Sequence, residues 1–529
     1  MHNISFYQNV LQRMSRRQLM NAAAILGTAA VAAPIFSRKT QAAPIFLDYP
    51  FQLGVASGDP TPNGVVLWTR LAPKHLEGGG MPAINVEVQW DVSTASNFSN
   101  IVQTGTEIAR PELGHSVHAE VTGLEPNKEY FYRFRAGSES TPTARTKTAP
   151  AVGQALDRVR FGLCGCNNYE AGFFTAYRGM ANENFDFIIH SGDYIYEGRD
   201  NGGRTPDTSV RRHNGQEIQT VVDYRNRYAL YKSDPNFLAA HASAPWLVTR
   251  DDHEVENNYT VVDENNLPPE IFALRRAMAY QAYYETMPLR KSAIPVGSHQ
   301  TVYRRVIWGD MMDIALLDTR QYRSDQPCGD GSKTGCADIN NPNATMLGTE
   351  QEKWLRDNLA TVKAKWTVLS QQVPIFMRDF IKSAPEGQFS MDKWDAYTAA
   401  RTRLMNDLKA TNAPNPVALS GDVHLAYASD LKMDYRNPNS ETVGVEFTGT
   451  SISSAGDGAE VQAGWDLIKG DNPHIKYHSA RRGYTAFGVT QNEFRAEYKI
   501  VDKVTVPNQP MRLGATVIAT SGKPGLQVA

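Results

Sequence analysis

Six short apolar runs in this chain each end in a cluster of polar side chains, and this pattern restricts the fold more than any other feature of the sequence. The runs cover residues 159–163, 185–190, 246–249, 312–317, 366–369 and 416–419, and we expect each to form a β-strand. Amphipathic stretches lie between the strands, with a helix expected over 173–184, so the sequence predicts an α/β fold. In α/β folds, ligand and catalytic groups collect where the carboxyl ends of the strands meet. The six polar clusters therefore predict one shared site.

The polar clusters contain carboxylates, imidazoles, a phenol and thiols, which suit metal binding better than a catalytic triad. No Gly-x-Ser-x-Gly elbow accompanies them. Asp193 and Tyr196 stand three positions apart after Gly192, where a tight turn could aim both at one centre. A phenolate or thiolate favours a hard or redox-capable trivalent ion, whereas carboxylates and amides suit calcium, magnesium or manganese. The chemistry predicts a cluster of two or more metals.

Residues 51–150 depart from this pattern and predict an all-β domain. Alternating or apolar runs such as 65–71 and 84–92 are separated by Pro, Gly and Asn. Leu124 and Pro126 followed by Tyr130 are typical of a tyrosine corner, in which the phenol bonds to the backbone at the edge of a β-sandwich. We expect a small fibronectin type III-like domain over 43–152, ahead of the α/β domain.

The first 42 residues have the features of an export signal. They contain five basic residues and no acidic ones, then a small-residue apolar stretch over 22–36 and Thr40-Gln41-Ala42 before Ala43. The pair Arg16-Arg17 resembles the twin-arginine signal. About 15 apolar residues are too few for a membrane anchor, which needs roughly 20. We therefore expect the twin-arginine translocase to export the folded protein to the periplasm or the medium, with no transmembrane helix in the mature form.

The four cysteines fall into two pairs with different expected roles. Cys328 and Cys336 lie in a loop rich in turn-forming residues, and export to an oxidising compartment predicts a disulfide between them. Cys164 and Cys166 are separated by one residue and cannot form an unstrained disulfide. A buried free cysteine is the ordinary role for either one, and we expect Cys164, where the strand should still be buried, to be a core residue.

Several clusters resemble the motifs of the metallophosphoesterase superfamily: Gly192-Asp193-x-x-Tyr196, Asp251-Asp252-His253-Glu254 and Gly421-Asp422-Val423-His424. Their particular variants, with Cys166-Asn-Asn-Tyr-Glu-Ala-Gly and Leu317-Asp-Thr-Arg-Gln-Tyr, are similar to the PhoD-type alkaline phosphatase and phosphodiesterase family. The opening Leu53-Gly-Val-Ala-Ser-Gly-Asp-Pro looks like that family's amino-terminal domain, so the similarity covers nearly the whole chain. The resemblance implies a calcineurin-like β-sandwich flanked by helices over 153–505 and a C-terminal extension over 506–529.

The resemblance further implies one ferric ion and calcium ions as cofactors. The residues it assigns to iron are Cys166, Asp193, Tyr196 and His424, with Asp193 bridging to the second metal. The residues it assigns to calcium are Asp252, Asp422 and either Asn257 or Asn258. The catalytic residues it implies are Asp193 and His253, with the histidine facing the substrate phosphate as a hydrogen-bond donor or proton shuttle.

Other charged residues near these motifs are expected to play supporting parts. We expect Asp318 and Arg320 to form a structural ion pair beside the site, and Glu197 to point away from the Asp193 side. Arg481 and Arg482 could contact a phosphate, but we prefer a solvated loop for both.

The sequence therefore predicts an exported, monomeric, metal-dependent hydrolase of small-molecule or lipid phosphate esters. A formal net charge of −2 gives no sign of specific nucleic-acid recognition. Two alternatives remain: a phospholipase D-like phosphodiesterase, and a non-catalytic cell-surface binding protein that uses only its small β-domain. The intact candidate ligands argue against the second alternative.

Overall fold

The structure is a computed structural model that describes residues 45–529 except 204–207, 262–266 and 382–385. The expected twin-arginine signal in residues 1–42 lies outside the described residues. The largest sheet contains ten strands, in the spatial order β24 (Leu526–Val528), β23 (Met511–Thr520), β22 (Glu493–Val501), β21 (Arg482–Val489), β9 (Val159–Cys164), β10 (Phe187–His190), β11 (Pro245–Val248), β1 (Val55–Thr61), β2 (Gly64–Arg70) and β5 (Ser116–Thr122).

A second sheet contains seven strands and packs against the first. Its order is β12 (Arg304–Trp308), β13 (Met312–Leu316), β15 (Trp366–Ser370), β17 (Pro416–Ser420), β19 (Thr442–Thr448), β18 (Ala426–Lys432) and β20 (Ile475–Ser479). One buried hydrophobic cluster contains side chains from both sheets. Across it, the rings of Phe187 and Trp308 lie 4.6 Å apart and those of Phe447 and Phe487 lie 5.5 Å apart. The expected α/β class is confirmed as a mixed α/β fold.

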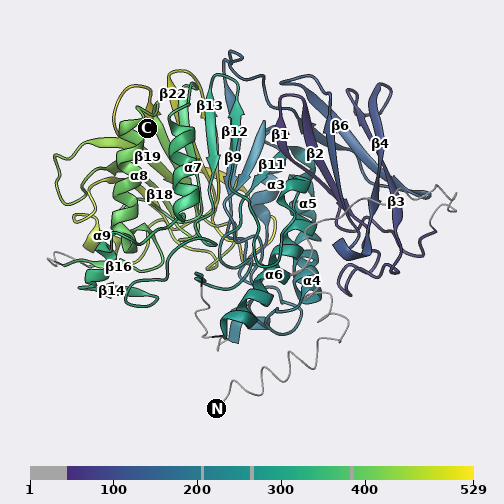
Figure 1. Ribbon diagram of the computed structural model, residues 1–529, viewed down its shortest axis with the longest axis horizontal. Helices are drawn as coiled ribbons and strands as arrows, with labels where there is room; N and C mark the ends of the chain where they lie inside the picture. The colour runs from purple at the N-terminus through teal and green to yellow at the C-terminus, as the bar shows by residue number, and fades with distance from the viewer. Residues whose placement is uncertain (1–44, 204–207, 262–266, 382–385) are drawn as a thin grey trace.

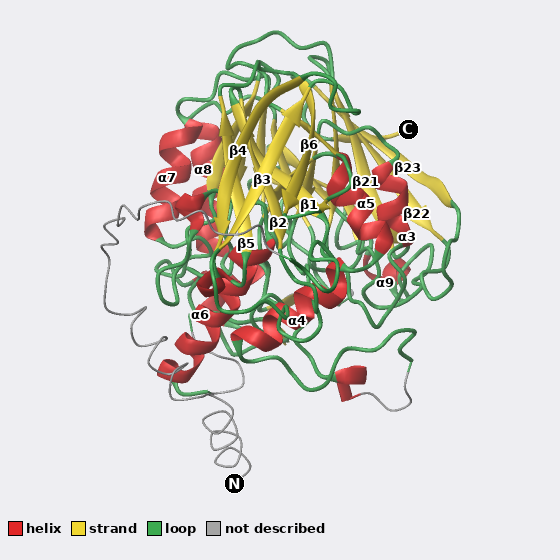
Figure 2. Ribbon diagram, turned by 90° about the vertical axis from the view of Figure 1, so that its right-hand side faces the viewer, coloured by secondary structure: helices red, strands yellow, loops and turns green. Residues whose placement is uncertain are grey.

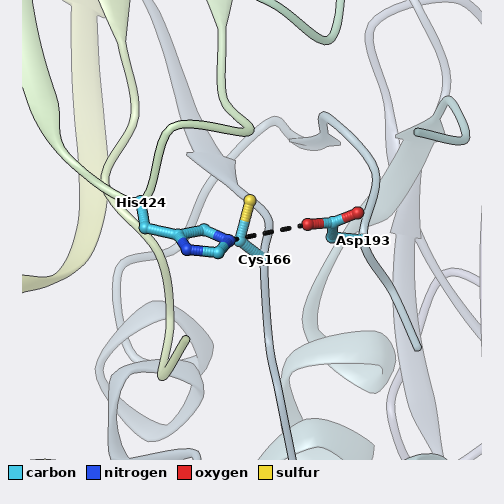
Figure 3. A group of neighbouring side chains, drawn as sticks. All are labelled: Cys166, Asp193 and His424. Carbon is cyan, nitrogen blue, oxygen red and sulfur yellow. Dashed lines mark ion pairs between the residues drawn. The ribbon is translucent and has the colours of Figure 1, made fainter. Parts of the chain in front are cut away.

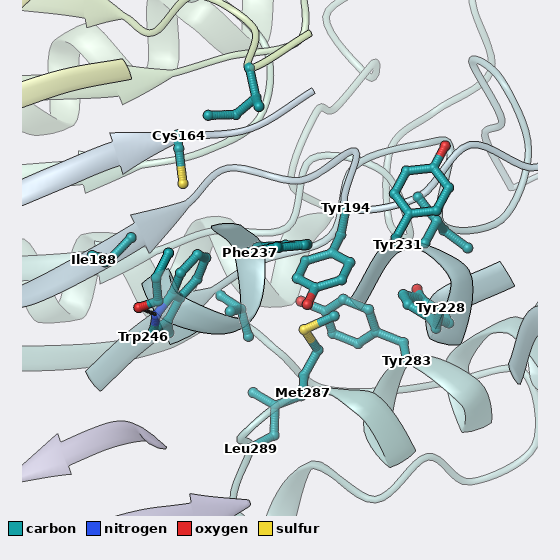
Figure 4. Close-up of a cluster of buried hydrophobic side chains, with 14 of the residues drawn as sticks. Cys164, Ile188, Tyr194, Tyr228, Tyr231, Phe237, Trp246, Tyr283, Met287 and Leu289 are labelled. Atoms are coloured by element: carbon teal, nitrogen blue, oxygen red, sulfur yellow. Dashed lines mark hydrogen bonds between the residues drawn. The ribbon is translucent and has the colours of Figure 1, made fainter. Parts of the chain in front are cut away.

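Helices cover the outer faces of the two sheets. The ten-stranded sheet is covered by α3 (Thr175–Ala181), α4 (Val221–Lys232), α5 (Pro235–Ser243) and α6 (Pro269–Thr286), whose aromatic side chains share a core with Cys164, Ile188 and Trp246 (Figure 4). The seven-stranded sheet is covered by α7 (Thr349–Leu359) and α8 (Thr398–Ala410). Figure 2 shows the strands between α7 and α8 on one side and α3 and α5 on the other. A short α9 (Trp465–Ile468) follows β19 along the chain.

The N-terminal part of the chain contributes to two sheets. A five-stranded sheet contains β4 (Ile101–Ala109), β3 (Val86–Ser93), β6 (Glu129–Ala136), β7 (Glu139–Ser140) and β8 (Ala144–Lys147). The expected tyrosine-corner contact is present, because the Glu125 backbone N–H donates to the Tyr130 hydroxyl at 2.9 Å. In contrast, β1 pairs in parallel with β11, with Gly58 opposite Trp246, so this segment shares a sheet with the rest of the chain (Figure 1).

The six expected strands are all present, as β9, β10, β11, β13, β15 and β17. The expected helix is shorter than predicted, since α3 begins at Thr175 and ends at Ala181. Within each sheet these strands run parallel, as β9–β10–β11 and β13–β15–β17, so the carboxyl ends of each set meet at one edge. This parallel arrangement brings the polar clusters together.

Candidate metal centre

The candidate ligands lie in loops that directly follow four of these strands. Cys166 follows β9, Asp193 follows β10, Asp252 follows β11, and Asp422 and His424 follow β17. Cys166, Asp193, Asp422 and His424 have φ angles of 55°, 57°, 65° and 56°. Non-glycine residues rarely adopt this left-handed conformation, and such strain tends to cluster at functional sites.

Gly192 allows two of these loops to approach each other closely. A Cβ atom at this position would lie 2.4 Å from both the backbone nitrogen and the Cβ of Asp251, and the φ of Gly192 is 113°. Only glycine meets both conditions without strain. The glycine before Asp193 is therefore required for the contact between the β10 and β11 loops.

Cys166, Asp193 and His424 form a first group, with potential ligand atoms all within 4.8 Å of one another (Figure 3). Tyr196 joins this group: its hydroxyl donates to Oδ2 of Asp193 at 2.7 Å and lies 2.9 Å from Nε2 of His424. Ser454, from the loop after β19, donates to the same hydroxyl at 2.7 Å. The structure therefore brings together all four residues expected on the iron side.

Two further groups extend the cluster from Asp193. One contains Asp193, Asp252 and His253, and the other contains Asp251, Asp252 and Asp422. Asp193 thus belongs to the first and second groups, and Asp252 to the second and third. Asp251 is a further carboxylate at the site that the sequence analysis did not assign.

The two candidate asparagines differ in their contacts with the site. Asn257 is exposed, and its backbone N–H donates to Glu197 at 2.9 Å. Asn258 is closer to the cluster, since its backbone N–H donates to Oδ2 of Asp252 at 2.7 Å. Its side-chain Nδ2 contacts both carboxylate oxygens of Asp330.

Arg320 lies in the middle of the acidic groups, which corrects the expected ion pair with Asp318. Its fully buried guanidinium contacts Asp251 and lies 2.7 Å from both Asp392 and Asp422. Asp318 instead pairs with Arg250 at 2.7 Å. The Asp318 carboxylate accepts the backbone N–H of Arg320 but does not pair with its guanidinium. The expected ion pair, inferred from two residues close in sequence, therefore had the wrong side-chain partner.

Lys393 adds a second cation, from the loop after β16 (Gln388–Ser390). Its Nζ lies 2.6 Å from Asp392 and also contacts Asp422. The sequence contains no local signal for this residue, because it follows none of the six strands.

Glu197 is part of the site, which corrects the expectation that it points away. Its carboxylate lies 2.7 Å from Nδ1 of His253 and also accepts the Asn257 backbone N–H. The loop after β10 is not an extended strand, so alternation fails there. Burial lowers the pKa of His253, but Glu197, Asp252 and Asp193 outweigh it and hold that pKa well above its usual range.

Glu254 fastens the β10 and β11 loops together. Its carboxylate accepts backbone N–H groups from Asp193 at 3.1 Å, from Asp251 at 2.7 Å and from Tyr194. Burial raises the pKa of Glu254 to about 8. This side chain fixes the backbone positions of the neighbouring acids.

The remaining expectations near the site have mixed outcomes. The Cys328–Cys336 disulfide is present, and Cys164 is buried in the core as expected. Arg482 is not solvated: it is buried and donates to the carbonyls of His424 and Gly456. Arg481 contacts Glu460 and the Asp502 carbonyl on the exposed side.

The donor set fits metal ions. Oδ1 of Asp193 and Oδ2 of Asp251 are buried without a hydrogen-bond partner among the described residues. Burial raises the pKa of Asp193 to about 8, and it raises that of the Cys166 thiol well above its usual range. Buried carboxylates of this kind stay ionised only with cations nearby, and Arg320 and Lys393 leave these two oxygens unpaired. The residues present therefore suit bound metal ions.

Comparison with known proteins shows which family the chain belongs to. A family model described as PhoD-like phosphatase matches residues 161–498, and one described as PhoD-like phosphatase, N-terminal domain, matches residues 38–150. Alkaline phosphatase D of Bacillus subtilis (strain 168) is 46% identical over 527 residues, which cover 99% of this chain and 90% of that protein. A solved structure, "Structure of PhoD", has a TM-score of 0.90 at 48% identity and covers 92% of this chain and 93% of its own.

The fold, the site and these similarities define a phosphoric ester hydrolase. The chain belongs to the PhoD-like phosphatase family, as the sequence motifs indicated. Membership of this family implies metal dependence, in agreement with the potential ligand groups. None of the helices in the described residues is both long and apolar enough to cross a membrane.

Proposed function

We propose that the buried cluster binds one ferric ion and calcium, and that the protein uses these metals to hydrolyse phosphate esters. The observation that carries this proposal is the position of Asp193. It shares one ligand group with the Cys166 thiol and His424, and another with Asp252 and His253. A carboxylate with donors of such different character on its two sides suits two different metals.

The two sides differ in the ions they would prefer. Cys166, Tyr196 and His424 offer thiolate, phenolate and imidazole, which together suit iron. Asp252, Asp422 and an asparagine amide offer only oxygen, as calcium prefers. Gln371 and Gln372 are buried in the loop after β15 and offer amide groups, not imidazoles.

When bound, the metals supply Lewis acidity and lower the pKa of a water molecule. The protein's own groups would orient the substrate and move protons around it. His253 holds its Nδ1 against Glu197, which leaves Nε2 to donate to a phosphoryl oxygen or to the departing alcohol. Arg320 keeps Asp251 and Asp422 in place from inside the protein.

The substrate test compares esters on one metal-analysed preparation. We expect hydrolysis of 4-nitrophenyl phosphate, bis(4-nitrophenyl) phosphate or both, with loss of activity in Asp193→Ala. The phospholipase D-like alternative predicts a preference for phosphatidylcholine over both. A metal-loaded protein that hydrolyses none of the three would support a binding protein instead.

The cellular setting completes the proposal. The mature protein would act as a monomer outside the cytoplasm after twin-arginine export, with 43–152 as its N-terminal domain and 153–505 as its catalytic domain. Replacing Arg16 and Arg17 by Lys should retain the precursor in the cytoplasm. Normal processing of that double variant would exclude the twin-arginine route.

A further inference from the structure

The disulfide-closed loop of residues 328–336 reaches the candidate calcium side of the site. Asp330, within this loop, accepts hydrogen bonds from Nδ2 of Asn258 at 3.0 Å and 2.9 Å, one on each carboxylate oxygen. The two residues are 72 positions apart in the sequence. The contact therefore joins the disulfide loop to the segment that carries Asp252.

The orientation of the Asn258 amide follows from this contact. An ionised carboxylate only accepts hydrogen bonds, so the amide nitrogen must face Asp330 and Oδ1 must face away from it. Among the described residues none donates a hydrogen bond to this Oδ1, which leaves the oxygen available to a cation.

The backbone of Asn258 is held at the same time. Its N–H donates to Asp252 at 2.7 Å, and its carbonyl accepts from Arg323 at 2.6 Å and from Gln326 at 2.7 Å. Its φ of 54° is left-handed. Because the Asn258 backbone is held beside Asp252, only the side chain of Asn258 can still rotate. Its two hydrogen bonds to Asp330 prevent that rotation.

The loop that carries Asp330 depends on a few attachments. Gly329 and Gly331, on either side of Asp330, have φ angles of 76° and 88°. One anchor is β14 (Ser332–Thr334), which pairs with β16, and the Gly331 carbonyl accepts the Met391 N–H at 2.8 Å. The disulfide closes the loop just outside these anchors. Without it, glycine freedom would let the carboxylate drift from Asn258.

We propose that Asp330 is a positioning residue that aims the Asn258 amide oxygen at the calcium ion, and that the Cys328–Cys336 disulfide keeps Asp330 in place. This inference rests on the proposed calcium side of the site. Groups that hold a metal ligand in its orientation commonly contribute a factor of about 10–100 to metal affinity. The same effect is expected here on calcium and not on iron.

The test measures calcium affinity by equilibrium dialysis, and iron content, on the mature full-length protein. Asp330→Ala should weaken calcium binding by about 10- to 100-fold and leave the iron content unchanged. Asp330→Asn keeps one acceptor oxygen and should restore most of the affinity. Asp338→Ala removes an exposed carboxylate from the same region without touching Asn258, so it should bind calcium like the wild type.

The outcomes separate the inference from the proposed function. Wild-type protein that binds no calcium would overturn the calcium side of the site, and this inference with it. Calcium-binding wild-type protein with unchanged affinity in Asp330→Ala, or with equal losses in Asp330→Ala and Asp338→Ala, would overturn the inference alone. The double variant Cys328→Ser, Cys336→Ser should also bind calcium more weakly, and unchanged affinity there would remove the disulfide from the account.

Discussion

Nδ1 of His253 lies 2.7 Å from the carboxylate of Glu197, and the centre of the imidazole ring lies 4.2 Å from the centre of the Tyr196 ring, with the two ring planes tilted by 31°. These contacts fix the rotation of the imidazole ring and engage its Nδ1 atom. Because Nδ1 is engaged, Nε2 is the nitrogen free to meet a substrate. We therefore propose that His253 transfers or shares a proton beside the metal cluster and does not itself bind a metal.

His253→Ala and Asp252→Ala should separate these two roles. Removing His253 should preserve iron and calcium content and lower kcat by roughly 10²- to 10⁴-fold, as for a lost acid or base group. Asp252→Ala should lose the second metal together with activity, because this carboxylate belongs to two ligand groups. Measuring the metal content and kcat of both variants shows whether each residue binds a metal or acts on the substrate.

The matching control is Glu197→Gln, which keeps a hydrogen-bond acceptor for Nδ1. It should retain both metals and lose less activity than His253→Ala. Loss of a metal from His253→Ala, or unchanged metal content and rate in Asp252→Ala, would show that the roles are assigned wrongly.

Glu254→Ala should destabilise the protein as well as the site. The change leaves the backbone N–H groups of Asp193, Tyr194 and Asp251 without their acceptor. A buried polar group left unpaired costs about 1–3 kcal/mol, so we expect a loss of at least about 2 kcal/mol in the free energy of unfolding. Urea unfolding of the metal-free proteins measures it, and Glu254→Gln, which retains one acceptor oxygen, should lose less. Equal free energies of unfolding for Glu254→Ala and wild type would contradict the conclusion that Glu254 holds the β10 and β11 loops together.

Glu446 should make the free energy of unfolding depend on pH. It is fully buried, and it accepts hydrogen bonds from Ser420 at 2.6 Å and from the Phe376 N–H at 3.0 Å. Burial raises the pKa of Glu446 to about 7, from its usual 4.5. The folded protein therefore holds this proton when the unfolded chain has released it, and the stability it contributes below pH 4.5 is lost as pH rises through about 7.

Glu446→Gln should remove this dependence, because the amide does not ionise. Relative to wild type, the variant should gain on the order of 3 kcal/mol in the free energy of unfolding between pH 5 and pH 9. Urea unfolding at the two pH values gives the difference. If the free energies of unfolding of variant and wild type differ by the same amount at pH 5 and at pH 9, Glu446 does not have the raised pKa described here.

The sequence predicted the strands, and it predicted that the polar clusters after them would lie together, because both depend on local features. Apolar runs followed directly by Cys166, Asp193, Asp252 and Asp422 are visible in the chain, and parallel pairing brings their ends to one place. The disulfide followed similarly from a short loop with two cysteines.

The missed features depend on contacts between distant segments. Arg320 reaches Asp251 and Asp392 across 69 and 72 positions, and no local pattern could choose them over the nearby Asp318. Glu197 was misplaced because strand alternation was extended into a loop. The parallel pairing of β1 with β11 likewise joins segments that the sequence divides into separate domains.

The visible absorption spectrum of the purified protein, recorded with its metal content and phosphatase activity, tests the central claim most directly. Thiolate and phenolate bound to iron(III) give charge-transfer bands, so the wild-type protein should be coloured and contain iron and calcium. Cys166→Ala and Tyr196→Phe should each weaken the colour and the activity. A colourless, fully active preparation that contains only zinc or calcium would contradict the account.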